Sequence, residues 1–223
     1  MKINNVYYII LLFITIIPIM AFAEEKSSVS NYTSPSSSSS SNITNVDFAT
    51  NIEFIKGNLS TAISNKQAGN NELTQTHTFH PITEIYTLIR DQLSSADSEL
   101  NKTLIDSLKN LTSIVIKSKP AELADSAASV DSLLNKAIII VLPENEIADI
   151  KFNMSSLINL LKTAESENYI GIANGTITNI LEYQDAKGFV SSANELLNKT
   201  TNSLNQTLTS NLSKMKDSLQ ELH

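Results

Sequence analysis

Two histidines and a glutamate near residue 80 stand at a spacing that could support metal chemistry. His77, His80 and Glu84 occur at i, i+3 and i+7, which would place two imidazoles and a carboxylate on one face of a helix. Side chains of this kind, projecting between the helices of a bundle, can bind a metal cation. The alternative is that the histidines cap or pack, and Pro81 biases His80 away from helical geometry.

A second set of candidate ligands surrounds a turn at Asn174-Gly175. Glu165 falls on the expected apolar side of the preceding helix, whereas Glu182 and Asp185 open the following one. If these helices are antiparallel neighbours, the three acids gather at one end of the bundle. Carboxylate, imidazole and phenolate groups suit ferric iron or another hard-to-borderline cation. The candidate metal site therefore contains His77, His80, Glu84, Glu165, Glu182 and Asp185.

Each of the later residues also has a purely structural interpretation. Glu182 could form a capping box with Asn179. Asp185 could be a solvated acid favoured by the helix dipole. Tyr169 and Tyr183 could pack in the core rather than bind a cation.

The stretch 169–190 is expected to join two long helices. Gly175 can adopt the left-handed conformation that ends a helix, and Asn179 can cap the next one. The second helix would then carry an apolar stripe with Glu182 at its edge, where a carboxylate needs a partner. That stripe contains Tyr183, Ala186, Phe189, Val190, Ala193 and Leu197.

The same stretch carries a family resemblance. The pattern Tyr-x-x-x-Ala-x-Gly-x-Ile from Tyr169, followed by Glu-Tyr-Gln-x-Ala-x-x-Phe from Glu182, resembles the extracytoplasmic helical domain that accompanies high-affinity iron permeases in prokaryotes. That family carries a similar His-Pro-x-x-Glu stretch, which here runs from His80 to Glu84. The resemblance covers residues 70–200 at most, and it implies iron transport with a membrane permease as partner.

Apolar spacings of three and four recur through most of the chain. Helices are expected from Asp47, over 72–94 with a kink at Pro81, from Asp97 or Ser98, over 120–142, over 147–169 and from Asn179 to the C-terminus. The apolar stripe of the fifth helix contains Ile147, Ile150, Met154, Leu157, Leu161 and Ala164. The sequence thus predicts an all-α, up-and-down bundle of five to six helices with a long C-terminal helix.

The N-terminal part of the sequence predicts an export signal followed by a linker. Lys2, an apolar run and Ala21-Phe22-Ala23 predict a signal peptide over 1–23, with an uncleaved anchor helix as the alternative. Residues 24–45 include a serine run and predict a disordered linker. The helical domain is expected over 46–223, in an extracytoplasmic location.

Composition narrows the classes of function. The net charge is −7 with a single arginine, Arg90, which disfavours nucleic-acid binding. There is no cysteine, and no phosphate loop or nucleophile elbow, so we do not expect an enzyme. The preferred hypothesis is an exported bundle that binds iron, or another divalent or trivalent cation, or hands it to a membrane transport partner. The alternative is a secreted or surface-tethered interaction protein that self-associates through its last helix.

Overall fold

The structure is a computed structural model that describes residues 43–220 of the 223-residue chain. The chain divides into two units, Met1–Ser39 and Ser40–His223, and the described residues all belong to the second. The predicted signal peptide over 1–23 and most of the predicted linker over 24–45 lie outside the described residues and stay predictions. The first described helix begins at Asn45, next to the predicted start of the domain.

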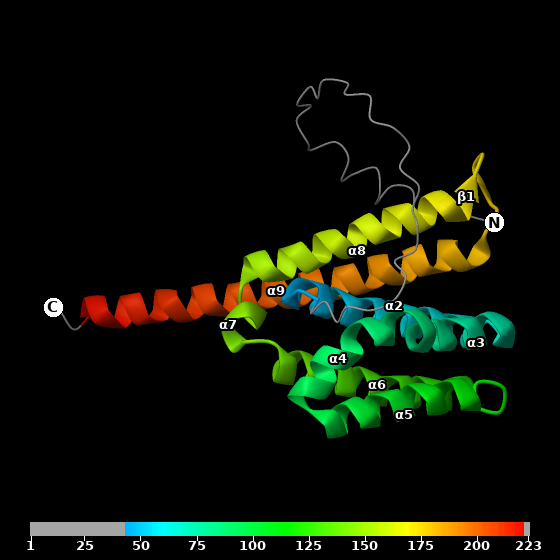
Figure 1. Cartoon of the computed structure of the whole chain (residues 1–223). Coiled ribbons are helices and arrows are strands. Elements are labelled where there is room, and N and C mark those ends of the chain that lie inside the picture. The colour runs from blue at the N-terminus through cyan, green and yellow to red at the C-terminus, as the bar shows by residue number, and fades with distance from the viewer. Residues whose placement is uncertain (1–42, 221–223) are drawn as a thin grey trace, which may run out of the picture. The chain divides into compact units, whose positions relative to one another are not determined.

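Helices form nearly all of the described region (Figure 1). In chain order the elements are α2 (Asn45–Gln67), α3 (Asn71–His80), the π-helical turn η1 (Pro81–Ile85), α4 (Tyr86–Ala96), α5 (Ser98–Ile114), α6 (Pro120–Val141), α7 (Glu144–Ile147), α8 (Ile150–Gly171), β1 (Ile172–Ala173), β2 (Thr176–Ile177) and α9 (Ile180–Gln220). The predicted all-α fold with a long C-terminal helix is confirmed.

Local signals define several helix starts. Thr44 and Asp47 form a capping box at α2. Asp97 caps α5 by accepting a hydrogen bond from the Leu100 N–H at 2.8 Å, and Pro120 opens α6. In these positions the amides of a first turn are bonded or, at proline, absent, which is why the sequence located the starts of α5 and α6. Helix α2 begins at Asn45, two residues before the predicted start at Asp47.

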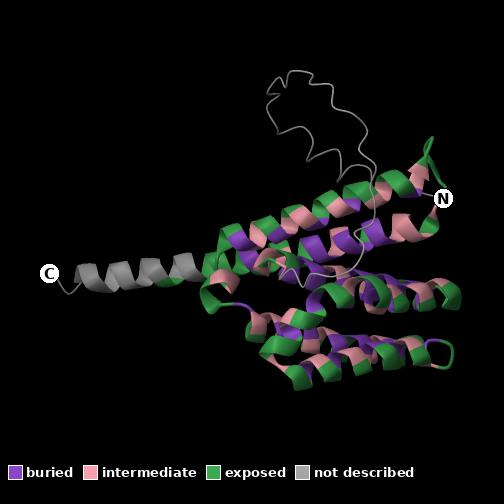
Figure 2. Ribbon diagram, in the orientation of Figure 1, coloured by how far each residue is buried: buried purple, intermediate pink, exposed green. Residues whose placement is uncertain are grey.

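Helix α2 lies between two apolar clusters (Figures 1 and 2). On one side it packs against α4 and α6, which in turn pack against α5. The cluster that these helices share includes Ile52, Leu104 and Leu134, all fully buried. On the other side α8 and α9 pair with each other and with α2, and the Phe54 and Phe189 rings lie 4.6 Å apart. The pairing of α8 with α9 therefore carries residues from the C-terminal part of the chain onto α2.

The predicted fifth helix differs from the observed one in its start and in its buried face. It begins at Ile150 rather than 147, because Asp149 caps it by accepting a hydrogen bond from the Lys151 N–H at 3.0 Å. Leu161, predicted as core, is 42% exposed, whereas Leu160 is fully buried. The buried face runs through Phe152, Ser156, Leu160 and Ala164. Ser156 occupies a core position, where its hydroxyl lies 3.1 Å from that of Thr50. Because serine is polar, the apolar pattern did not include this position, and the predicted stripe placed Leu161 in the core instead of Leu160.

The joint between α8 and α9 is a small β-hairpin rather than a glycine C-cap. Helix α8 ends at Gly171, and β1 pairs antiparallel with β2, with Ile172 opposite Ile177. Asn174 and Gly175 both have positive φ, 52° and 73°. Positive φ at both central residues defines the tight hairpin turn that Asn-Gly favours. Within the region that the structure describes, none of the helices is both long and apolar enough to span a bilayer.

Candidate metal centre

Helix α3 and its π-helical turn position the two histidines. Asn70 caps α3 by accepting a hydrogen bond from the Leu73 N–H at 3.0 Å. His80 keeps helical backbone angles, with φ −50° and ψ −47°, although proline follows it. The predicted kink at Pro81 is a π-helical turn in which the Tyr86 N–H donates to the Pro81 carbonyl. A single wide turn of this kind accommodates an extra residue without ending the helix, and such turns often occur at functional sites.

Two glycines allow α9 to approach α2 closely. A Cβ added to Gly188 would lie 2.6 Å from the carbonyl oxygen of Gly57 and from the hydroxyl of Thr61. Just before Gly188, Thr61 donates to the Gln184 carbonyl at 3.3 Å. This crossing fixes the first turns of α9 against α2 and thereby brings Asp185 to the histidines of α3.

The candidate centre consists of His77, His80 and Asp185. The His77 Nδ1 atom lies 3.0 Å from Asp185 Oδ1, and His80 Nδ1 lies 3.5 Å from Asp185 Oδ2. One ligand atom from each residue lies within 4.8 Å of the other two. The His77 side chain is fully buried and that of His80 is 21% exposed. The centre is therefore closed on its His77 side and reachable on its His80 side.

A pair of amides orients the far side of the His77 ring. His77 Nε2 lies 2.8 Å from Gln184 Oε1. Gln184 and Asn65 exchange two amide hydrogen bonds, of 2.9 and 3.1 Å, and this exchange directs the Gln184 oxygen toward the ring. An oxygen at that position accepts a hydrogen bond from the Nε2–H of His77, and Nδ1 lies on the side of the ring that faces Asp185.

The Asp185 carboxylate has an unused acceptor. Asp185 is only 6% exposed. Among the described residues, none donates a hydrogen bond to its Oδ1 atom. The nearby Nδ1 of His77 is close enough for an ion pair, but it is not aligned for a hydrogen bond with Oδ1 and instead faces Asn58 Oδ1 at 3.5 Å. A buried oxygen without a donor is costly, and a bound cation would satisfy it.

The charges of the centre are mutually dependent. The Asp185 carboxylate raises the pKa of His80 above its usual 6.5, against the opposing effect of burial, and Glu84 and Glu182 add to the increase. Burial alone would raise the pKa of Asp185, but the two histidines together lower it below 3.8. Asp185 is therefore an anion that attracts positive charge, either as protons on the imidazoles or as a metal ion.

The remaining predicted ligands lie at different distances from the centre. Glu84 is exposed, with its Oε1 4.0 Å from His80 Nε2, so it stands at the open side. Glu182 is half-buried and acts electrostatically on His80. Glu165 lies on the exposed face of α8 and is not part of the cluster. The structure thus brings together His77, His80 and Asp185 and leaves Glu165 apart.

Glu165 was expected on the buried side of α8, but Glu167 is the acid that lies there. Burial is the largest cause, and a hydrogen bond with Glu182 and repulsion from it come next; together they raise the pKa of Glu167 to about 8. Glu167 therefore keeps its proton near neutrality. Glu167 stands three residues after Ala164, on the buried face of α8. The error in the predicted face of α8 concealed Glu167, and hydrophobicity gave no signal for it because the polar residue Ser156 occupies that face.

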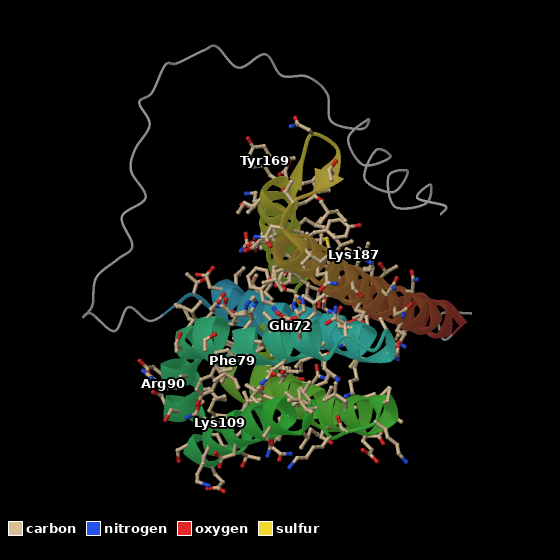
Figure 3. The ribbon with its side chains drawn as sticks, turned by 90° about the vertical axis from the view of Figure 1, so that its right-hand side faces the viewer. Glu72, Phe79, Arg90, Lys109, Tyr169 and Lys187 are labelled. Carbon is tan, nitrogen blue, oxygen red and sulfur yellow. The ribbon has the colours of Figure 1, made fainter. Side chains whose placement is uncertain are left out.

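Two alternative interpretations can also be assessed. The Asn179 side chain accepts from the Leu181 N–H at 3.2 Å, while the Asn179 N–H donates to the Gly171 carbonyl at 3.1 Å. The Asn179 amide is therefore bonded elsewhere, and Glu182 interacts with Glu167 instead of closing a capping box. Tyr169 is 84% exposed near the end of α8 (Figure 3), so its predicted core position is wrong.

Comparison with known proteins gives a family match in the C-terminal part of the chain. Residues 143–223 match the family model of the iron permease-associated 4-helix bundle domain. No curated protein and no solved structure gives a significant match. The resemblance predicted from the motifs at Tyr169 and Glu182 is confirmed. The matched segment includes Asp185 and Glu182, whereas His77 and His80 lie before it.

Proposed function

We propose that this protein is an exported helical domain that binds a metal cation at His77, His80 and Asp185 and passes it to a membrane iron permease. The observation that carries the proposal is the buried Asp185 carboxylate. Its Oδ1 faces the His77 imidazole and accepts no hydrogen bond from any described residue, and its Oδ2 faces the His80 imidazole. In this proposal the protein binds cargo and catalyses no reaction.

The donor spacing supports a single bound ion. Two donors bound at about 2.1 Å to one tetrahedral ion lie about 3.4 Å apart. The separations of 3.0 and 3.5 Å from the Asp185 oxygens to the two imidazoles are close to that value. The ligand atoms of the three residues lie within 4.8 Å of one another. Small rotations of these side chains would therefore bring all three atoms to one ion.

The family match supports iron as the cargo and a permease as the partner. Domains of this kind are associated with iron permeases, and the sequence predicts export through residues 1–23, which would place the domain on the outer side of a membrane. The open side of the centre carries Glu84, 66% exposed, beyond His80. An exposed acid beside a partly open histidine provides a route by which a cation can enter and leave.

A comparison of two acid-to-amide variants tests this proposal. Asp185→Asn keeps the volume of the side chain but removes its charge, and it should abolish the increase in melting temperature that Fe²⁺ or Zn²⁺ produces in the wild type. Glu165→Gln is the matched control, because Glu165 lies outside the cluster, and it should retain the increase. The proposal fails if no cation stabilises the wild-type protein, or if both variants respond as the wild type does.

A further inference from the structure

Helix α8 carries a second apolar face, which the fold leaves exposed (Figure 2). Its buried face packs against α2 and α9. On another side of the helix, six positions follow one another at intervals of four, four, three, four and four residues. These intervals keep all six within an arc of about 100°. The α8 stripe consists of Ile150, Met154, Ile158, Leu161, Glu165 and Tyr169.

The α8 stripe is open to solvent along the whole helix. Met154 is half-buried. The other four apolar members are between 41% and 84% exposed: Ile150, Ile158, Leu161 and Tyr169. The pattern that predicted a core face on this helix shares Ile150, Met154 and Leu161 with the stripe, so that pattern is apolar without serving the core of one copy. Apolar side chains gathered on an exposed face mark an interaction surface.

The spacing of the α8 stripe is the same when it is read in either direction along the helix. Two antiparallel copies of α8 therefore place every member of one stripe opposite a member of the other. Ile150 lies opposite Tyr169 of the second copy, and Ile158 lies opposite its Leu161. Each of these contacts occurs twice, as the two-fold symmetry of a homodimer requires.

The charges beside the stripe favour this antiparallel arrangement. Lys151 is exposed near the start of α8 and Glu165 near its end, and within the region described neither forms an ion pair. An antiparallel pair brings Lys151 opposite Asn168 of the second copy, one turn from its Glu165. A parallel pair would place Glu165 beside a second Glu165, which like charges disfavour. Lys162 lies near the middle of α8 and does not distinguish the two arrangements.

Other occupants fit the stripe less well than a second copy does. A lipid bilayer would have to accommodate the charge of Glu165 within its apolar contact, which is costly. Residues 24–42 of the same chain contain, apart from one proline, only two apolar side chains, Val29 and Tyr32. Two side chains are too few to cover a stripe with five apolar members.

From these observations we propose that the protein forms an antiparallel two-fold dimer in which α8 packs along its stripe against α8 of a second copy. None of the stripe residues belongs to the cluster of His77, His80 and Asp185, so the dimer is independent of the proposed function. A single helix of 22 residues from each copy offers a small interface beside the roughly 800 Å² per partner of a standard one. We therefore expect association at high protein concentration and dissociation on dilution.

Single-cysteine variants test the pairing and its direction, because the native chain contains no cysteine. Ile150→Cys and Tyr169→Cys are prepared as full chains, mixed and oxidised, and the disulfide-linked products are identified by intact mass. We expect the mixture to give the mixed dimer. Neither variant alone should cross-link, since its two cysteines would stand about 28 Å apart in the antiparallel pair. Ile139→Cys, at an exposed position of α6, measures cross-linking by random collision.

A charge placed in the stripe tests the same interface without a cross-link. Ile158→Glu should raise the dimer dissociation constant by about tenfold or more in sedimentation equilibrium, whereas Ile139→Glu should not. Circular dichroism and the cation-induced increase in melting temperature should stay unchanged in both variants, which separates a failed dimer from a failed cation centre.

Three results would overturn the proposed dimer. One is cross-linking of Ile150→Cys or Tyr169→Cys alone above the collision level, which indicates a parallel pair. Another is a monomer at every concentration, whether or not it sediments with vesicles of phosphatidylcholine and phosphatidylglycerol; sedimentation with the vesicles would assign the stripe to a bilayer. The third is a dimer that Ile158→Glu leaves intact.

Discussion

The close crossing of α2 and α9 predicts a specific effect of Gly188→Ala. The new Cβ would lie 2.6 Å from the Gly57 carbonyl oxygen, whereas ordinary contacts begin at 3.4 Å, so α9 must move by about 3.4 − 2.6 = 0.8 Å. Overpacking of this kind costs about 1–3 kcal/mol. Alanine returns about 1 kcal/mol through its higher helix propensity. We therefore expect a net loss of up to about 2 kcal/mol in the free energy of unfolding.

The same displacement should affect cation binding. Asp185 lies one turn before Gly188, and its distances to the two imidazoles of 3.0 and 3.5 Å are set by the position of α9. Urea unfolding followed by circular dichroism measures the stability, and calorimetric titration with Zn²⁺ measures the affinity. Both quantities should fall in Gly188→Ala.

A control separates the crossing from helix propensity. Asn194→Ala changes an exposed position of the same helix and should alter the free energy of unfolding by no more than about 0.5 kcal/mol. If Gly188→Ala instead stabilises the protein by about 1 kcal/mol, propensity alone explains the effect. The close contact of α2 with α9 would then be refuted.

Three further predictions concern the buried face of α8 and the titrating groups. Leu160→Ala should lower the free energy of unfolding by about 2–5 kcal/mol and Leu161→Ala by no more than about 0.5 kcal/mol, and equal effects in urea denaturation would reject the observed register. Asp185 raises the pKa of His80 above 6.5, and only the neutral imidazole binds metal. When the pH is lowered from 8 to 6, the Zn²⁺ affinity should therefore start to decrease before the pH reaches 6.5. A constant affinity would exclude His80 as a ligand. Burial raises the pKa of Glu167 from 4.5 to about 8. Between these two pH values Glu167 keeps its proton in the folded protein but loses it in the unfolded chain. The free energy of unfolding of the wild type should therefore decrease as the pH rises from 4.5 to 8. Glu167→Gln should reduce the difference in unfolding free energy between pH 5 and pH 8. An unchanged difference would contradict the raised pKa of Glu167.

Helix positions were predictable wherever local chemistry determines them. Asp97 and Pro120 mark helix starts through groups in their own first turns. Four leucines of α5 recur at helical spacing and are all buried: Leu100, Leu104, Leu108 and Leu111. Such signals need no knowledge of the rest of the fold.

Predictions failed where a tertiary contact overrides the local pattern. Ser156 is buried because it meets Thr50 on another helix, and hydrophobicity cannot anticipate that position. The error moved the expected core position from Leu160 to Leu161. A one-residue shift rotates a helix face by about 100°, which is enough to exchange a buried leucine for an exposed one. Glu165, the acid expected at the site, is exposed, and the half-buried acid is Glu167, two residues later.

The convergence of α3 with α9 was partly predictable. Helical spacing placed His77 and His80 on one face, and the joint near Gly175 placed Asp185 in an early turn of α9. The amide pair of Gln184 and Asn65 was not foreseen, because these residues stand 119 positions apart and meet only through the α2–α9 crossing.

Anomalous X-ray diffraction from crystals grown with Zn²⁺ or Co²⁺ gives the most direct test of the cation centre. The proposal predicts an anomalous peak at about 2.0–2.2 Å from His77 Nδ1, from His80 Nδ1 and from an oxygen of Asp185, the three residues that cluster in the structure. A peak confined to other residues, or no peak when the metal is present in excess, would contradict the assignment of this centre.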